Sequence, residues 1–256
     1  MESDAPALVI EHLSKSFGPK RAVDDLSLAV PQGCLFGFVG PNGAGKTTTL
    51  SMATGLLRPD RGVVRVWGHD VWTAPPAAKA LMGILPDGYR TFDRLSGREL
   101  LRFCGQLRRM DGAQIDARIE TLLDVLGLSG DADTLVCDYS AGMGKKIGLA
   151  CALLHNPSLL VLDEPFESVD PVSGQTIRSI LHQFVAGGGT VVMSSHVMEL
   201  VESLCDAVAV IAAGRVLAVG TVEAVRGGMS LQDRFVQLVG GGPVRTQEGL
   251  SWLHQS

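Results

Sequence analysis

The chain has 256 residues, of which 46% are hydrophobic and 19% charged, and its formal net charge is −5. This length and apolar content suffice for one large α/β domain, or for one domain with a small subdomain. Its 22 basic and 27 acidic residues form no block of like charge. We therefore expect no nucleic-acid partner, which would require a basic face. The longest apolar runs are far shorter than the ~20 residues that a membrane span needs.

The N-terminal part of the chain is expected to be mainly β. Residues 7–13 and 22–30 nearly alternate apolar and polar side chains, which is typical of half-buried strands. The continuous apolar run 34–39 predicts a strand buried on both faces. A helix is expected in the second half of 40–57, and a turn then leads to a further strand that begins at residue 63.

Residues 90–150 have a helical pattern instead. Ser96 and Glu99 are spaced as a capping box, and the residues after them have helical periodicity. A second helix is expected to end at Gly127. It places five apolar residues on one face: Ile115, Ile119, Leu122, Leu123 and Leu126. This segment is predicted to be a helical insertion between strands.

The last part of the chain returns to strand–helix–strand alternation, which indicates a parallel sheet. A strand is expected at 159–162, a helix near 174–185 and a strand near 190–196. The final strands, within 207–220, are expected to bend at 213–214. The predicted fold class is α/β, with a mostly parallel sheet, an N-terminal antiparallel β subdomain and the inserted helical subdomain.

Residues 40–47 read G-P-N-G-A-G-K-T and match the phosphate-binding pattern G-x-x-x-x-G-K-[ST]. Glycines let backbone N–H groups surround phosphates, and the helix N-terminus adds favourable partial charge. We expect Lys46 to reach the β- and γ-phosphates and the Thr47 hydroxyl to bind Mg²⁺. The alternative, a glycine-rich turn without a ligand, is disfavoured because a strand and a helix flank the pattern correctly. The predicted nucleotide-binding residues here are Gly40, Pro41, Asn42, Gly43, Ala44, Gly45, Lys46, Thr47 and Thr48.

Two acidic residues follow the buried strand 159–162. Ligands of α/β sheets bind at the C-terminal ends of the strands. We therefore expect Asp163 to hold Mg²⁺, usually through water, and Glu164 to polarise the water that attacks the nucleotide. Taken alone, the pair would be better interpreted as a solvated acidic turn at the end of a strand. The phosphate loop elsewhere in the chain favours the catalytic interpretation.

A second stretch, 138–146, also contains a Gly–Lys pair but is not another loop of the first kind. Five residues before Gly144 stands Tyr139 rather than glycine, and lysine follows where serine or threonine would be required. Ser140 and Gly142 remain, just before a helical run whose N-terminus could bind an anion. From the residues alone, an ordinary N-cap is the better interpretation of Ser140.

The order of these motifs resembles the nucleotide-binding ATPase subunit of ABC transporters. The phosphate loop is followed by Y-S-A-G-M, by L-D-E-P and then by S-S-H. The resemblance covers residues 7–225, which we take as one ATPase domain with a P-loop NTPase core, followed by a short tail, 226–256. It implies that Y-S-A-G-M is the signature motif, in which Ser140 and Gly142 grip the γ-phosphate held by the opposite subunit of a head-to-tail dimer. The Gly–Lys pair is then incidental.

The same resemblance implies three further site residues and leaves one open. Phe17 matches the aromatic residue that stacks on adenine, although a core aromatic is the alternative. Asp170 matches the acidic end of a loop that contacts the opposite subunit, and His196 matches the switch histidine that contacts the γ-phosphate. Asp87 stands where the family usually has glutamine, so its catalytic contact with Mg²⁺ or water is left open. The signature also departs from L-S-G-G-Q at Tyr139, Ala141 and Met143.

These motifs predict an ATP-hydrolysing subunit that drives a separate membrane permease, with ATP and Mg²⁺ as cofactors. The resemblance implies the exporter-type branch, permease partners, and a second ATPase subunit that is either identical or related. The chain is then expected in the cytoplasm, peripheral to the inner face of the membrane. Two alternatives stay open: a soluble ATPase for assembly, as in iron–sulfur cluster formation, and a degenerate regulator that binds ATP without turnover.

Overall fold

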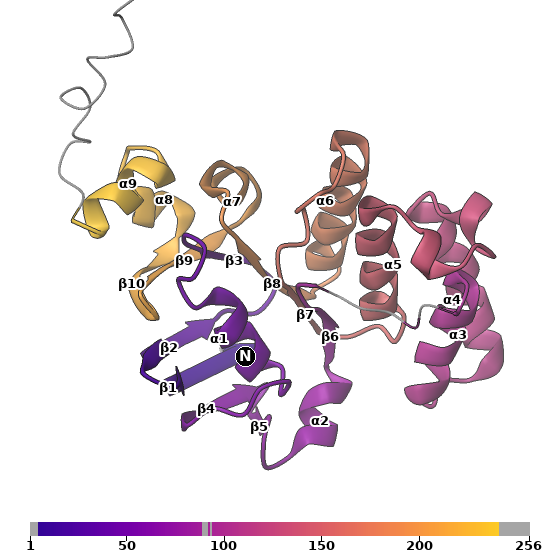
Figure 1. Ribbon diagram of the computed structural model, residues 1–256, viewed down its shortest axis with the longest axis horizontal. Coiled ribbons are helices and arrows are strands. Elements are labelled where there is room, and N and C mark those ends of the chain that lie inside the picture. Colours follow the sequence, from indigo (N-terminus) through magenta and orange to yellow (C-terminus); the bar gives the residue numbers. More distant parts are fainter. Residues whose placement is uncertain (1–4, 89–91, 93, 241–256) are drawn as a thin grey trace, which may run out of the picture.

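The computed structural model describes residues 5–88, 92 and 94–240, and its elements build two sheets with helices around them (Figure 1). The first sheet is antiparallel, with strand order β2-β1-β4-β5. Its strands are β1 (Leu8–Phe17), β2 (Lys20–Val30), β4 (Arg61–Val66) and β5 (His69–Asp70). The predicted N-terminal antiparallel subdomain is therefore confirmed.

The second sheet has the strand order β10-β9-β3-β8-β7-β6 and is parallel except for the β9–β10 pair. Ala213 and Gly214 join that pair with φ of 48° and 76°, so both central residues of the turn have the left-handed conformation that suits a tight hairpin. The strands are β3 (Leu35–Val39), β6 (Met82–Leu85), β7 (Leu159–Leu162), β8 (Thr190–Ser195), β9 (Ala207–Ala212) and β10 (Arg215–Thr221).

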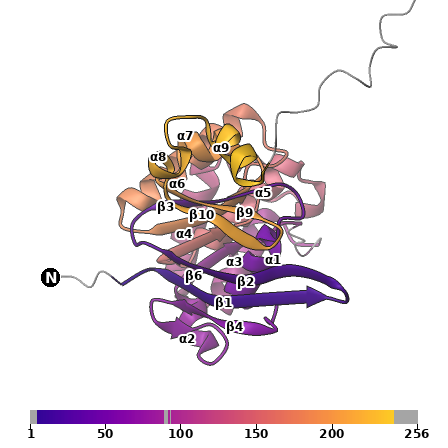
Figure 2. The ribbon, with the colours of Figure 1, turned by 90° about the vertical axis from the view of Figure 1, so that its left-hand side faces the viewer.

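The second sheet separates two hydrophobic cores. Along β3, Leu35 and Val39 face a core that they share with the helical insertion. Phe36 and Phe38 face the other core, which they share with the antiparallel sheet and α1 (Lys46–Ala53). This alternation is the reason for the continuous apolar sequence of β3, since both faces of a central parallel strand are covered. Figure 2 shows the antiparallel sheet below the second sheet and α7 (Met198–Leu204) above it.

The chain between β6 and β7 is helical, as predicted. It contains α3 (Gly97–Leu107), α4 (Gly112–Val125) and α5 (Ala141–Leu153), with short 3-10 turns between α4 and α5. Both hydrogen bonds of the Ser96–Glu99 capping box are present, and Gly127 after α4 has φ of 63°. The limits 7–225 and 90–150 remain predictions. Residues 90, 91 and 93, and residues 241–256 of the predicted tail, lie outside the described part.

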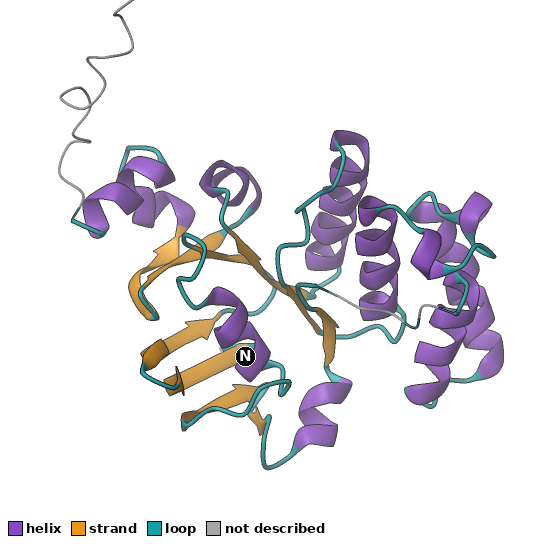
Figure 3. Cartoon of the chain, viewed as in Figure 1, coloured by secondary structure: helices purple, strands orange, loops and turns teal. Residues whose placement is uncertain are grey.

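The remaining helices lie outside the insertion (Figure 3). They are α2 (Pro75–Ala80), α6 (Pro171–Ala186), α8 (Val222–Arg226) and α9 (Leu231–Leu238), besides α1 and α7. Within residues 5–88, 92 and 94–240, no helix combines the length and the apolar character needed to cross a membrane. In sequence, α8 and α9 follow the last strand of the second sheet.

Candidate functional site

The loop that joins β3 to α1 is packed so tightly against its surroundings that two of its glycines cannot carry a side chain. A Cβ atom on Gly40 would stand 2.1 Å from the Ile211 carbonyl oxygen, and one on Gly45 would stand 2.5 Å from the Ala22 carbonyl oxygen. Gly45 also has φ of 105°, which side chains disfavour. This packing fixes the loop backbone in place. The loop ends at the N-terminus of α1, where backbone N–H groups can bind an anion.

One cavity of about 420 Å³ lies over this loop. The loop residues Asn42 to Thr48 line it together with Phe17, Asp87, Glu164 and His196, so the structure brings these predicted residues together. Phe17 is 51% exposed at the end of β1. The alternative of a core aromatic is therefore wrong, and the ring is accessible to a ligand. Lys20, Ala22 and Glu167, which the motifs did not indicate, also line the cavity.

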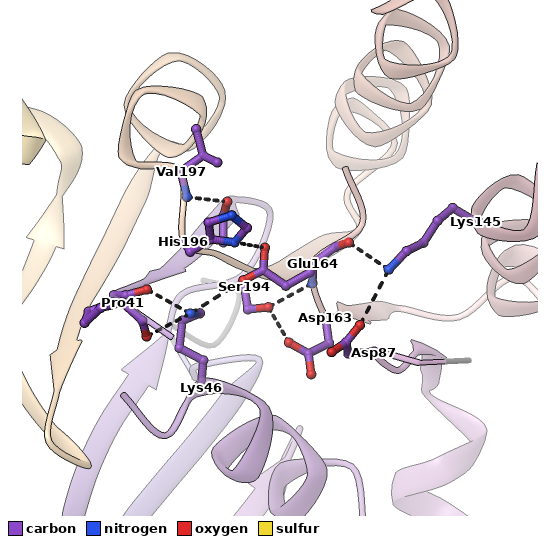
Figure 4. Close-up of polar contacts among 11 residues, drawn as sticks. Pro41, Lys46, Asp87, Lys145, Asp163, Glu164, Ser194, His196 and Val197 are labelled. Atoms are coloured by element: carbon purple, nitrogen blue, oxygen red, sulfur yellow. Dashed lines mark hydrogen bonds and ion pairs between the residues drawn. The ribbon is translucent and has the colours of Figure 1, made fainter. Parts of the chain in front are cut away.

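Lys46 stands at the first residue of α1, and its ammonium group points back into the loop (Figure 4). Its Nζ donates hydrogen bonds to the carbonyl oxygens of Gly40 at 2.8 Å and Pro41 at 3.3 Å. It also lies 3.5 Å from Glu164 Oε1. The side chain is 6% exposed, and a buried ammonium requires such partners. Its positive charge is thus fixed beside the loop.

Glu164 follows β7 with φ of 48°, a left-handed conformation that costs a non-glycine residue roughly 1–3 kcal/mol. Its contacts hold it there (Figure 4). The backbone N–H donates to Ser194 Oγ at 2.9 Å, and the side-chain Oε2 lies 3.0 Å from His196 Nδ1. The carboxylate therefore lies between the Lys46 ammonium and the imidazole.

Asp163 is 4% exposed and lies outside the residues that line the cavity. Burial raises the pKa of this carboxyl, and hydrogen bonds from Ser194 and Thr47 act against the rise. The Ser194 hydroxyl donates to Asp163 Oδ1 while it accepts from the Glu164 N–H. The Thr47 hydroxyl and the Asp163 carboxylate are thus close enough to interact. Carboxylate and hydroxyl oxygens are the ligands that Mg²⁺ prefers, so this donor set fits that ion.

Ser194 and Lys145 belong to this cluster but were not among the predicted site residues. Ser194 is fully buried on β8, which also contains the buried Thr190 and Ser195. A buried hydroxyl requires a partner, and that was the available signal. Lys145 was expected to be incidental. The structure instead places its Nζ 2.9 Å from the Glu164 carbonyl oxygen and 3.9 Å from Asp87 Oδ1.

The residues that the resemblance assigns to the opposite subunit or its nucleotide lie outside this cavity but close to one another. Ser140 is the N-cap of α5 and accepts from the Met143 N–H at 3.3 Å. Asp170 is the N-cap of α6, and hydrogen bonds from Ser173 are the main reason that the pKa of its carboxyl is lowered. A Cβ atom on Gly142 would lie 3.7 Å from Asp170 Oδ2. Two helix N-termini therefore meet at one place.

Comparison with known proteins identifies relatives along most of the chain. The family model described as "ABC transporter" matches residues 23–167. The linearmycin resistance ATP-binding protein LnrL of Bacillus subtilis is 36% identical, over 84% of this chain and 69% of its own length. The daunorubicin/doxorubicin resistance ATP-binding protein DrrA of Streptomyces peucetius is 38% identical, over 84% of this chain and 65% of its own. For the Nod factor export ATP-binding protein I of Paraburkholderia xenovorans the identity is 35%, and the shares are 96% and 81%.

Solved structures agree with the fold described above. An ATP-binding subunit of an ABC transporter superposes with a TM-score of 0.85 at 27% identity, covering 91% of this chain and 99% of that one. CbiO1 of Clostridium perfringens, part of the ABC transporter complex cbiONQ, has a TM-score of 0.74 at 23% identity, with coverage of 92% and 95%. At that identity the second likeness concerns the fold alone.

Proposed function

Because this chain belongs to the ABC transporter family, as an ATP-binding subunit with ATPase activity, we propose that it hydrolyses ATP in a head-to-tail dimer and drives export through a membrane permease. One observation supports this most directly. Lys46, Glu164 and His196 converge on the loop of α1, where the nucleotide phosphates would lie.

The proposed nucleotide lies along the cavity, with its adenine near the exposed Phe17 ring and its phosphates over the loop N–H groups. Lys46 is directed to the β- and γ-phosphates, in exchange for its contact with Glu164. Thr47 and Asp163 would hold Mg²⁺, because the hydroxyl and the carboxylate are close enough to interact. When bound, that ion would neutralise charge on the transferred phosphoryl group.

Catalysis is then mainly positioning and neutralisation of charge, as in other phosphoryl transfers. Glu164 orients the attacking water. His196 fixes the direction of the Glu164 carboxylate through the 3.0 Å contact and lies where it can also reach the γ-phosphate. Asp87 lines the same cavity, so a contact with the ion or with water is within the geometry proposed for it.

The second subunit is proposed from the position of Ser140, Gly142 and Asp170. These residues lie together, outside the cavity of their own chain. Helix N-termini attract anions, so the first turn of α5 suits the γ-phosphate of a nucleotide held by a facing subunit. The partner is either a second copy or a related chain.

The permease is proposed from the relatives, whose names describe drug resistance and Nod factor export. Docked on such a permease, the chain would lie in the cytoplasm against the inner face of the membrane. An assembly ATPase and a regulator without turnover were the alternatives. The relatives do not favour the first, and the retained Lys46, Glu164 and Ser140 do not favour the second.

The proposal is tested by ATP hydrolysis and dimer formation of the purified protein, compared with Glu164→Gln. We expect the variant to bind ATP, to hydrolyse it roughly a hundredfold or more slowly, and to accumulate as an ATP-bound dimer in size-exclusion chromatography. Glu199→Gln, an exposed acidic residue in the first turn of α7, is the matched control and should behave as wild type. Unchanged hydrolysis by Glu164→Gln would refute the catalytic assignment.

A further inference from the structure

Lys145 projects from the helical insertion into the site from the side opposite Lys46 (Figure 4). It stands on α5, five residues after the N-cap Ser140. Its Nζ donates to the Glu164 carbonyl oxygen at 2.9 Å, and its side chain is 15% exposed. An ammonium group this well covered makes a defined contact, unlike a surface lysine that is free to sample many rotamers.

The Glu164 backbone needs such a partner. Its left-handed φ of 48° is unfavourable for a residue with a side chain, so the neighbouring contacts must select it. On one side of the residue, the N–H is fixed by Ser194 on β8. On the other side, the carbonyl accepts hydrogen bonds from the Lys145 ammonium at 2.9 Å and from the Glu167 N–H at 3.2 Å, and Lys145 is the partner that comes from the helical insertion. Because the peptide units before and after Glu164 are both held, the Cα–Cβ direction of the carboxylate is held as well.

Lys145 also faces Asp87, whose Oδ1 is 3.9 Å from the ammonium. Asp87 comes directly after the β6 strand and Pro86, at the start of the chain that leads into the helical insertion. One lysine on α5 therefore contacts both the residue that enters the insertion and the backbone of the residue that follows β7. At this distance the Asp87 contact is an ion pair without a close hydrogen bond, so the Glu164 carbonyl is the stronger partner.

We propose that Lys145 is a positioning residue for ATP hydrolysis: it fixes the Glu164 backbone and links it to the first turns of α5. This inference rests on the proposed function, in which Glu164 orients water and Ser140 contacts the nucleotide of the facing subunit. A displacement of α5 on dimer closure would then reach the Glu164 carboxylate through one side chain. The contact acts on turnover, because Lys145 lies outside the residues that line the nucleotide cavity.

The test compares steady-state ATP hydrolysis and ATP binding for Lys145→Met, which keeps most of the length of the side chain but removes the donor. Lys145→Arg is the conservative variant, since its guanidinium can donate to the same carbonyl. Lys146→Met is the matched control, because it removes the same charge from the next residue of α5, which lies near Gly127 instead. Wild type and Glu164→Gln are measured in the same series.

We expect Lys145→Met to lower kcat roughly tenfold or more while KM and the affinity for ATP stay within about threefold of wild type. Lys145→Arg should recover kcat to within about threefold of wild type. Lys146→Met should have the same kcat as wild type. If thermal melting shows Lys145→Met to be unfolded, Lys145→Ala is judged by the same criteria. Unchanged kcat in Lys145→Met, a loss matched by weaker ATP binding, or failure of arginine to recover turnover would each overturn the inference. Absence of hydrolysis in the wild type would instead refute the proposed function.

Discussion

Ser194→Ala tests whether one buried hydroxyl holds the two acidic residues of the site in place. The Ser194 side chain is fully buried on β8. Its Oγ donates to Asp163 Oδ1 and accepts from the Glu164 N–H at 2.9 Å. Alanine removes both hydrogen bonds and offers no replacement.

The expected cost follows from these two bonds. A hydrogen bond to a charged group contributes about 1.5–3 kcal/mol, and an unsatisfied buried N–H costs about 1–3 kcal/mol. We therefore expect Ser194→Ala to lower the free energy of unfolding by about 3 kcal/mol. For a chain of this size that corresponds to a fall in Tm of roughly 6–12 °C.

The effect of pH on this variant has a definite sign. Burial already raises the pKa of Asp163, and the bond from Ser194 opposes that rise, so the pKa should rise further without it. A raised carboxyl pKa costs stability when the group is ionised and costs nothing once it is protonated in both states. The destabilisation by Ser194→Ala should therefore be largest at neutral pH and should shrink as the pH falls.

Thr190→Val is the matched control because it lies at the opposite end of the same strand. Thr190 is fully buried, and its Oγ1 accepts a hydrogen bond from the Gly33 N–H at 2.9 Å. We expect this control to lose about 1 kcal/mol of stability and to retain ATP hydrolysis. Thermal melting and ATPase assays of the two variants, in parallel with wild type, measure the loss of stability and of ATP hydrolysis. If Ser194→Ala were no less stable than Thr190→Val, or if it hydrolysed ATP as fast, the reasoning would be refuted.

Two further predictions concern the loop and a buried histidine. Gly40→Ala should weaken ATP binding by roughly tenfold or more, because its Cβ would stand 2.1 Å from the Ile211 carbonyl oxygen and displace the loop. Calorimetric titration measures the affinity, and an unchanged value would contradict this prediction. Burial, reinforced by the nearby Arg108 charge, lowers the pKa of His155 from 6.5 to about 4. The unfolded chain therefore binds a proton at this residue more readily than the folded chain, and folding stability should fall as the pH drops from about 6.5 towards 4. Between about pH 7.5 and pH 5, wild type should lose roughly 1–2 kcal/mol more than His155→Gln, and equal losses in thermal melts would exclude the effect.

Much of the fold was predictable because its determinants are local. The capping box of Ser96 and Glu99 and the stop at Gly127 are both visible within a few residues of sequence. The continuous apolar runs of β3 and β7 likewise indicate buried parallel strands. The phosphate loop could be recognised because its spacing is fixed by the ligand it is built to hold.

Other features of the site depend on contacts between distant parts of the chain. Lys145 reaches Glu164 and Asp87 only because the insertion packs α5 beside the ends of β6 and β7, and no local pattern encodes that packing. Phe17 was ambiguous between core and ligand because an aromatic residue at the end of a strand suits both; its exposure decides against the core. Ser194 was overlooked because both faces of β8 are buried, so alternation does not show which residue faces the site.

The central position of β3 has a consequence for the order in which the protein can be completed during synthesis. Leu35 pairs with Val191 and Phe36 pairs with Ala207, so both neighbours of the strand that carries the phosphate loop are translated long after it. Contacts of such long range are slow to form, because a long loop must close first. The growing chain therefore exposes an apolar central strand until β8 and β9 leave the ribosome, and a chain that stops before them has the motif for binding phosphate but not the sheet that supports it.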